Sequence, residues 1–198
     1  QVKAAMRLMN QAKKPLVISG GGVIFSDSAD KMNEFINTFG IPVVNTLMGH
    51  GLNPQNEDLY LGPFGMHGSG YGNYAVQNAD LIIAAGVRFC DRVTGNFDTF
   101  APKAKIIHID VDPAEIGKNI QISIPIVGNV KSVLSQILEL KKENQKYDYS
   151  NWVEEIKTKK VKQPLSYTKG DKLKPQYLIQ LINQFFPEDT IVTADVGQ

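Results

Sequence analysis

The segment with the clearest capacity for chemistry is residues 86–95, which read G-V-R-F-C-D-R-V-T-G. Two arginines, Arg88 and Arg92, stand four residues apart, and Asp91 lies between them. A guanidinium group stays charged and can hold phosphate or carboxylate oxygens with paired hydrogen bonds, and a neighbouring carboxylate can orient it. The pattern is typical of an anion-binding loop and, by composition alone, equally typical of a surface cluster of ion pairs.

Three glycines, residues 20–22, come directly after a short apolar run and before a helical pattern. A turn that cradles phosphate uses this arrangement, because glycine permits positive φ and a close approach of the backbone. Phe25 stands where the third glycine of G-x-G-x-x-G would be, so the standard nicotinamide fingerprint is absent. The alternative is a plain tight turn between a strand and a helix.

Two further glycine-rich stretches are N-T-L-M-G-H-G at 45–51 and G-P-F-G-M-H-G-S-G at 62–70. They contain too much glycine for a core and too many apolar side chains for an ordinary surface. Methionine and histidine beside accessible backbone suit a pocket for a flat aromatic ligand. His50, His67 and His108 lack the spacing of metal ligands, so packing or capping is their expected role and no metal site is predicted.

Carboxylates follow the apolar run at 106–109. An acidic side chain at the end of a parallel strand can accept a hydrogen bond from a ribose or ribityl hydroxyl, and we assign Asp110 to this role. Asp112, followed by Pro113 and Glu115, is expected to cap a short helix. Cys90 has basic neighbours but no partner base nearby in the sequence, so we interpret it as non-catalytic.

Short apolar runs at 16–18, 42–44, 81–85, 106–109 and 124–127 alternate with helical patterns at 2–9, 32–39 and 130–138. This order predicts an α/β fold: a doubly wound, mostly parallel sheet of about six strands with helices on both faces. Pro125 favours an edge position for the last of these strands. Ligands bind beyond the carboxyl ends of such strands, so the loops that follow them form the candidate site.

The predicted domain occupies residues 1–147, and the polar, lysine-rich stretch that follows is interpreted as part of a linker over 148–175. Residues 176–198 hold an amphipathic helix and a strand that begins at Ile191, and we expect them to start another domain. The chain begins without methionine and ends one residue after a glycine, which indicates a piece of a longer protein.

The composition is that of an ordinary globular protein, with 198 residues, 42% hydrophobic residues and a formal net charge of +1. So balanced a charge attracts neither nucleic acid nor an anionic membrane. The single cysteine excludes an internal disulfide and favours a reducing compartment, by default the cytoplasm. No apolar run reaches the roughly 18 residues that a membrane-spanning helix needs.

Taken in order, the motifs resemble those of the large catalytic subunits of acetolactate synthases, also called acetohydroxyacid synthases. The resemblance runs from end to end, and M-H-G together with R-F-x-D-R is specific to the biosynthetic, flavin-containing branch of thiamine-diphosphate enzymes. It implies a three-domain enzyme in which this chain is the middle domain, which binds FAD.

The resemblance also implies a role for particular residues. The residues implied to contact FAD are Gly21, Thr46, Leu47, Phe64, Gly65, Met66, His67, Gly86, Val87, Arg88, Arg92, Val93, Asp110, Val111 and Asn129. Asp91 and Arg92 would face the entrance of the active site, and Val196, Gly197 and Gln198 would touch thiamine diphosphate. Cys90 and Asn129 stand where the family often has aspartate, which removes two possible acceptors.

Members of the family condense two pyruvates, or pyruvate and 2-ketobutyrate, with loss of CO2 in branched-chain amino-acid biosynthesis. They use thiamine diphosphate and Mg2+, carry FAD without net redox chemistry, and form homodimers or homotetramers with a small regulatory subunit. The activating glutamate and the metal ligands belong to the other domains, so this chain alone is expected to bind FAD without carboligase activity. Another thiamine-diphosphate decarboxylase or oxidase, or a stand-alone nucleotide-binding module, is the alternative.

Overall fold

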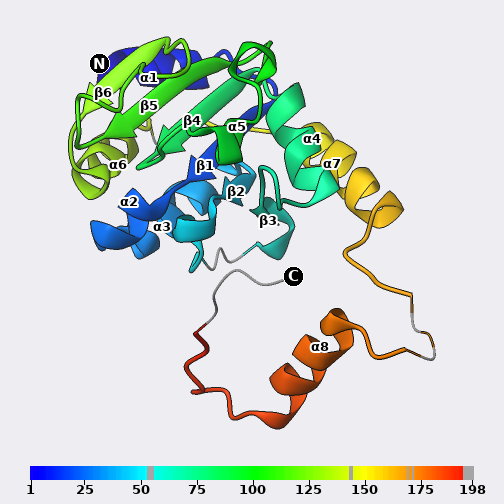
Figure 1. The fold of residues 1–198 in the computed structure, drawn as a ribbon. Coiled ribbons are helices and arrows are strands. Elements are labelled where there is room, and N and C mark those ends of the chain that lie inside the picture. Colours follow the sequence, from blue (N-terminus) through cyan, green and yellow to red (C-terminus); the bar gives the residue numbers. More distant parts are fainter. Residues whose placement is uncertain (53–55, 143–144, 169, 171, 194–198) are drawn as a thin grey trace. The chain divides into compact units, whose positions relative to one another are not determined.

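The computed structural model describes residues 1–52, 56–142, 145–168, 170 and 172–193. It divides the chain into two compact units, Gln1–Pro164 and Leu165–Gln198. The described part of the first unit contains one parallel sheet of six strands in the order β3-β2-β1-β4-β5-β6 (Figure 1). The strands are β1 (Pro15–Ser19), β2 (Val43–Asn45), β3 (Tyr60–Pro63), β4 (Leu81–Ala85), β5 (Lys105–Asp110) and β6 (Ile124–Val127).

Helices connect and cover these strands. Those of the first unit are α1 (Val2–Met9), α2 (Gly21–Phe25), α3 (Ala29–Phe39), α4 (Gly70–Asn78), α5 (Asp91–Thr94), α6 (Val130–Glu139) and α7 (Ser150–Lys162), with the 3-10 turns η1 (Leu47–Gly49), η2 (Glu57–Leu59) and η3 (Phe97–Thr99). The second unit holds α8 (Pro175–Phe185).

The strand order reverses between β1 and β4. The chain moves outward from β1 through β2 to β3, then returns to place β4 beside β1 and moves outward the other way. The helices form two packed groups: α6 packs with α1 and α3, whereas α4 packs with α7, which lies beside it in Figure 1. The predicted doubly wound fold is confirmed.

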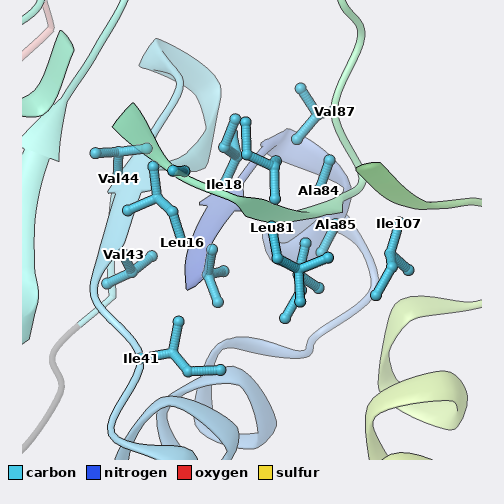
Figure 2. Close-up of a cluster of buried hydrophobic side chains, with 14 of the residues drawn as sticks. Leu16, Ile18, Ile41, Val43, Val44, Leu81, Ala84, Ala85, Val87 and Ile107 are labelled. Atoms are coloured by element: carbon cyan, nitrogen blue, oxygen red, sulfur yellow. The ribbon is translucent and has the colours of Figure 1, made fainter. Parts of the chain in front are cut away.

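The core lies along the central strands. Every residue of β1 and β4 is buried, and Figure 2 shows Leu16, Ile18, Leu81 and Ala84 of these strands within a cluster of buried hydrophobic side chains. Burial on both faces of the sheet explains why these strands read as apolar runs without alternation. The predicted edge position of β6 is also confirmed.

The structure differs from the predicted elements at three places. Strand β3 overlaps the start of the glycine-rich stretch at 62–70, where no strand was predicted. Residues 113–117 form turns in place of a helix, because the carboxylates of Asp110 and Asp112 accept backbone N–H groups two residues on and hold a turn. Residues 191–193 do not form the predicted strand, since a strand needs a neighbouring strand to pair with. The rest of that segment lies outside the described residues.

The compact unit extends beyond the boundary predicted at 147, because α7 packs on the domain. Trp152 and Ile156 are buried, and the Trp152 Nε1–H donates to the carbonyl of Pro15 at 3.0 Å. Glu155 accepts hydrogen bonds from Lys14 Nζ and from the Tyr74 hydroxyl, at 2.7 to 2.8 Å. The polar composition of this segment concealed two apolar side chains four residues apart, which share one face of a helix.

Among the described residues, none of the helices has both the length and the apolar character that crossing a bilayer requires.

A candidate cofactor site at the carboxyl edge of the sheet

The loops after β1 and β4 meet at the point where the strand order reverses. A Cβ on Gly20 would lie 2.1 Å from the Gly86 carbonyl oxygen, and one on Gly22 would lie 2.6 Å from the Gly86 Cα. These two glycines are therefore explained by backbone packing between loops. Gly21 remains partly exposed and faces Met48, whose Cβ would be 3.0 Å from a Cβ placed on Gly21.

The side chains of Asn45 and Tyr60 hold the start of the loop after β2 by hydrogen bonds. Asn45 Nδ2 donates to the carbonyl of Thr46 at 2.9 Å, and the Tyr60 hydroxyl donates to Asn45 Oδ1 at 2.9 Å. Burial raises the pKa of Tyr60, which keeps this hydroxyl protonated as a donor. Above these groups, Leu47 and Met48 are 81% and 63% exposed. The loop thus presents two large apolar side chains on a rigid base.

The loop after β3 joins the arginine loop, residues 86–92. Asn73 on α4 holds Gly65 on both sides, accepting from its N–H at 2.8 Å and donating to its carbonyl at 3.0 Å. The next backbone N–H, of Met66, donates to the carbonyl of Arg92 at 3.1 Å. Phe64 points into the core, whereas Met66 and His67 are exposed. The two most specific motifs of the sequence are therefore in direct contact.

The arginine loop exposes both of its guanidinium groups. Val87 and Phe89 are buried, which leaves Arg88 between them exposed. Arg92 is also exposed, and within the described part of the chain neither guanidinium forms an ion pair. Asp91 does not orient either guanidinium, since its carboxylate accepts the backbone N–H of Arg92 at 2.9 Å. The described residues thus form no cluster of ion pairs here.

The end of β5 carries a carboxylate over a buried histidine. Asp110 is almost buried; its Oδ1 accepts the N–H of Asp112, and its Oδ2 lies 3.9 Å from His108 Nε2. His108 is fully buried and its Nε2 lies 2.9 Å from the Val87 carbonyl oxygen. Burial lowers the pKa of His108. The hydrogen bond to Val87 and the charges of Asp110 and Glu115 raise it, but they offset the effect of burial only in part.

The last loop of this edge follows β6. Asn129 caps α6, since its Oδ1 accepts the N–H of Ser132 at 3.4 Å. The preceding residue, Gly128, donates its N–H to the Asp110 carbonyl at 2.9 Å. Val111, next to Asp110, is exposed. The amide that the family resemblance assigns to FAD is thus partly used as a helix cap.

The structure brings most of the sequence-predicted residues to one edge of the sheet. The side chains exposed there are those of Leu47, Met66, His67, Arg88, Arg92, Val111 and Asn129. Phe64 and Val87 are core residues that offer a ligand only their backbone. Val196, Gly197 and Gln198 lie outside the described residues. Sequence reasoning missed Asn73 and gave His108 only a role in packing or capping, because their hydrogen bonds join segments that are distant in the sequence.

The fold described above is that of a doubly wound α/β domain, and comparison with known families shows to which family it belongs. Residues 2–137 match the family described as the central domain of thiamine pyrophosphate enzymes, and the chain belongs to that family. The match covers the whole sheet and ends within α6.

Within this family, the chain is similar to acetolactate synthases. The acetolactate synthase large subunit of Corynebacterium glutamicum is 46% identical over 100% of this chain and 32% of its own length. The chloroplastic acetolactate synthase of Arabidopsis thaliana is 43% identical over 98% of the chain and 29% of its own length. A probable acetolactate synthase large subunit of Methanocaldococcus jannaschii is 43% identical over 100% of the chain and 35% of its own length.

The chain spans about a third of the length of these relatives. It is the middle domain of an acetolactate synthase-like thiamine pyrophosphate enzyme. In the part of the chain that the structure describes, there is no group of three histidine, cysteine or acidic side chains that could hold a metal ion.

Proposed function

We propose that the chain binds FAD at the carboxyl edge of its sheet, as the middle domain of a thiamine-diphosphate-dependent acetolactate synthase. The observation that carries the proposal is the junction of the loops after β3 and β4. There the Met66 N–H donates to the Arg92 carbonyl, which joins the backbones of two residues whose side chains are exposed. One side chain is apolar, and the other is a guanidinium without an ion-pair partner among the described residues. FAD combines a flat aromatic ring with a diphosphate, and the loops offer both kinds of contact.

Each part of FAD has matching residues. Leu47 and Met66 supply apolar surface for a flat ring system, which dispersion and burial favour. Arg88 and Arg92 supply guanidinium groups for the diphosphate. Asp110 Oδ2, which accepts no hydrogen bond from the described residues, supplies an acceptor for a ribityl or ribose hydroxyl. The backbone around Gly21 and Gly86 allows the ligand to approach closely.

The remaining contacts follow from the family resemblance. They are Thr46, Phe64, Gly65, His67, Val87, Val93, Val111 and Asn129 for FAD, with Asp91 and Arg92 facing the entrance to the active site and Val196, Gly197 and Gln198 touching thiamine diphosphate. For Phe64 and Val87, burial restricts the contact to backbone atoms. In the reaction of the whole enzyme, bound FAD would contribute structure without net redox change.

For the whole enzyme we propose the activity that the relatives' names imply. It would condense two pyruvates, or pyruvate and 2-ketobutyrate, with loss of CO2, using thiamine diphosphate and Mg2+. Homodimers or homotetramers and a small regulatory subunit belong to the same proposal. This chain's own part in that activity is to bind and orient the flavin, since a cofactor's protein supplies position and electrostatics.

Titration of the purified chain with FAD tests the proposal. Flavin fluorescence or calorimetry should report binding, whereas NAD should not compete. Arg88→Gln and Arg92→Gln should each weaken FAD binding by about tenfold or more, because each removes a charge-assisted hydrogen bond. Arg7→Gln, an exposed arginine on α1, is the matched control and should bind FAD as the unchanged chain does.

The outcome also separates the proposed FAD site from the alternative of a stand-alone nucleotide-binding module. A stand-alone nucleotide-binding module would prefer NAD or another nucleotide to FAD. Equal loss of FAD affinity in the Arg7 control and the two loop variants would contradict a specific site at the arginine loop. Absence of FAD binding by the unchanged chain would contradict the proposal itself.

A further inference from the structure

We propose that His108 is a positioning residue for the arginine loop: its Nε2–H holds the Val87 carbonyl and so fixes the backbone from which Arg88 extends. The consequence for ligand binding rests on the proposed FAD site. The effect on the loop itself stands without a ligand and can be measured without one.

The contacts of His108 reach both neighbours of Arg88. Its Nε2 lies 2.9 Å from the carbonyl oxygen of Val87. The imidazole also packs edge to face on Phe89, with ring centroids 5.0 Å apart at 74°. Phe89 in turn packs against Phe100, with centroids 5.7 Å apart. A single buried side chain on β5 therefore supports the residues before and after the exposed arginine.

The hydrogen bond between His108 and the Val87 carbonyl fixes the tautomer of the imidazole. A carbonyl oxygen can only accept, so His108 Nε2 must carry the proton. His108 Nδ1 is buried and has no hydrogen-bond partner among the described residues, which is consistent with its being the unprotonated nitrogen. The lowered pKa of His108, caused first by burial, keeps the ring neutral near pH 7. The side chain acts as a neutral donor of one hydrogen bond.

The loop depends on this donor because its other supports lie on either side of the Val87 carbonyl. Gly86 donates its N–H to the Ile109 carbonyl at 2.8 Å and has a positive φ of 59°, where the chain turns away from β4. Beyond Arg88, Asn119 Nδ2 donates to the Phe89 carbonyl at 2.7 Å. Without His108, the Val87 carbonyl would be a buried acceptor left unpaired, and rotation of the Val87–Arg88 peptide would relieve it.

Three substitutions separate this role from simple packing. His108→Gln can place an amide N–H near the position of Nε2 and should preserve the hydrogen bond. His108→Asn is too short to reach Val87, and His108→Leu fills the space but cannot donate. Hydrogen exchange of the ligand-free chain should be about fivefold to tenfold faster at residues 87–92 in the Asn and Leu variants, the effect of losing one hydrogen bond. Exchange in β1 and β4 should stay unchanged.

Two further measurements complete the test. Nitrogen NMR of the imidazole in the unchanged chain should show a proton on Nε2 and none on Nδ1. FAD should bind the Gln variant within about threefold of the unchanged chain and the Asn and Leu variants about fivefold to tenfold more weakly.

Specific results would overturn the proposal. They are a proton on Nδ1, unchanged exchange of the loop in the Asn and Leu variants, or acceleration that is equal across the loop and the central strands. Failure of the Gln variant to restore slow exchange would do the same. If the unchanged chain does not bind FAD, the proposed function fails, whereas the exchange and NMR results still decide the role of His108.

Discussion

Gly22 and Gly86 lie with their backbones in contact across the point where the sheet reverses its strand order. A Cβ on Gly22 would lie 2.6 Å from the Gly86 Cα, and a Cβ on Gly86 would lie 2.5 Å from the Gly22 Cα. The Gly22 N–H also donates to the Gly86 carbonyl at 3.1 Å. The turn after β1 and the arginine loop after β4 are therefore one packed unit.

Gly22→Ala should destabilise the chain by about 1–3 kcal/mol, because the new methyl group meets backbone atoms that cannot move aside. Urea unfolding measures the change. Gly128→Ala is the control, since its Cβ would meet only a methyl group of Val133 at 3.3 Å. Equal stability of the Gly22 variant and the unchanged chain would show that the two loops are not packed as described.

Asp27 has a positive φ of 50°, and its side chain forms an exposed ion pair with Lys131 at 3.1 Å. Asp27→Gly should therefore give a more stable chain than Asp27→Ala, by about 1 kcal/mol, because alanine is strained in this conformation and glycine is not. Both variants lose the ion pair, so its contribution cancels in the comparison. Thermal unfolding measures the difference, and a more stable alanine variant would contradict the backbone conformation.

Glu155 attaches α7 to the domain through Lys14 and Tyr74. Burial of Glu155 raises its pKa, but the hydrogen bonds from Lys14 and Tyr74 and the charges of Lys14 and Lys159 together lower it overall. Glu155→Gln should destabilise the chain by about 0.5–1.5 kcal/mol, a range that allows for partial exposure of the pair. Glu154→Gln, one residue away on a side chain that is 73% exposed, should change stability by less than about 0.3 kcal/mol.

How far the sequence predicts this structure depends on whether a pattern is local. The strands β1, β4 and β5 were predictable because burial on both faces leaves an apolar run that needs no partner to be recognised. Strand β3 was not, since a short edge strand in a glycine-rich segment is defined by its pairing with β2. The same distinction holds for the site: Arg88 is visible as a motif, whereas His108 acquires its role from a carbonyl 21 residues earlier.

The buried His108 should also make stability depend on pH. Its pKa in the folded chain is lowered from the ordinary value of 6.5, chiefly by burial, while Val87, Asp110 and Glu115 act in the opposite direction. Below pH 6.5 the unfolded chain therefore binds a proton that the folded chain does not, and stability falls as the pH falls. Between pH 6.5 and 5.5 this one group should remove up to about 1 kcal/mol of unfolding free energy.

The comparison with His108→Gln isolates that contribution. Glutamine does not titrate, whereas the carboxylates, including Glu155, respond to acid in both chains and cancel in the difference. The unfolding free energy of the unchanged chain minus that of the Gln variant should be constant from pH 7 to 8 and decrease below pH 6.5. An increase in this difference on acidification would mean that folding raises the pKa of His108, and the imidazole would then hold the Val87 carbonyl as a cation.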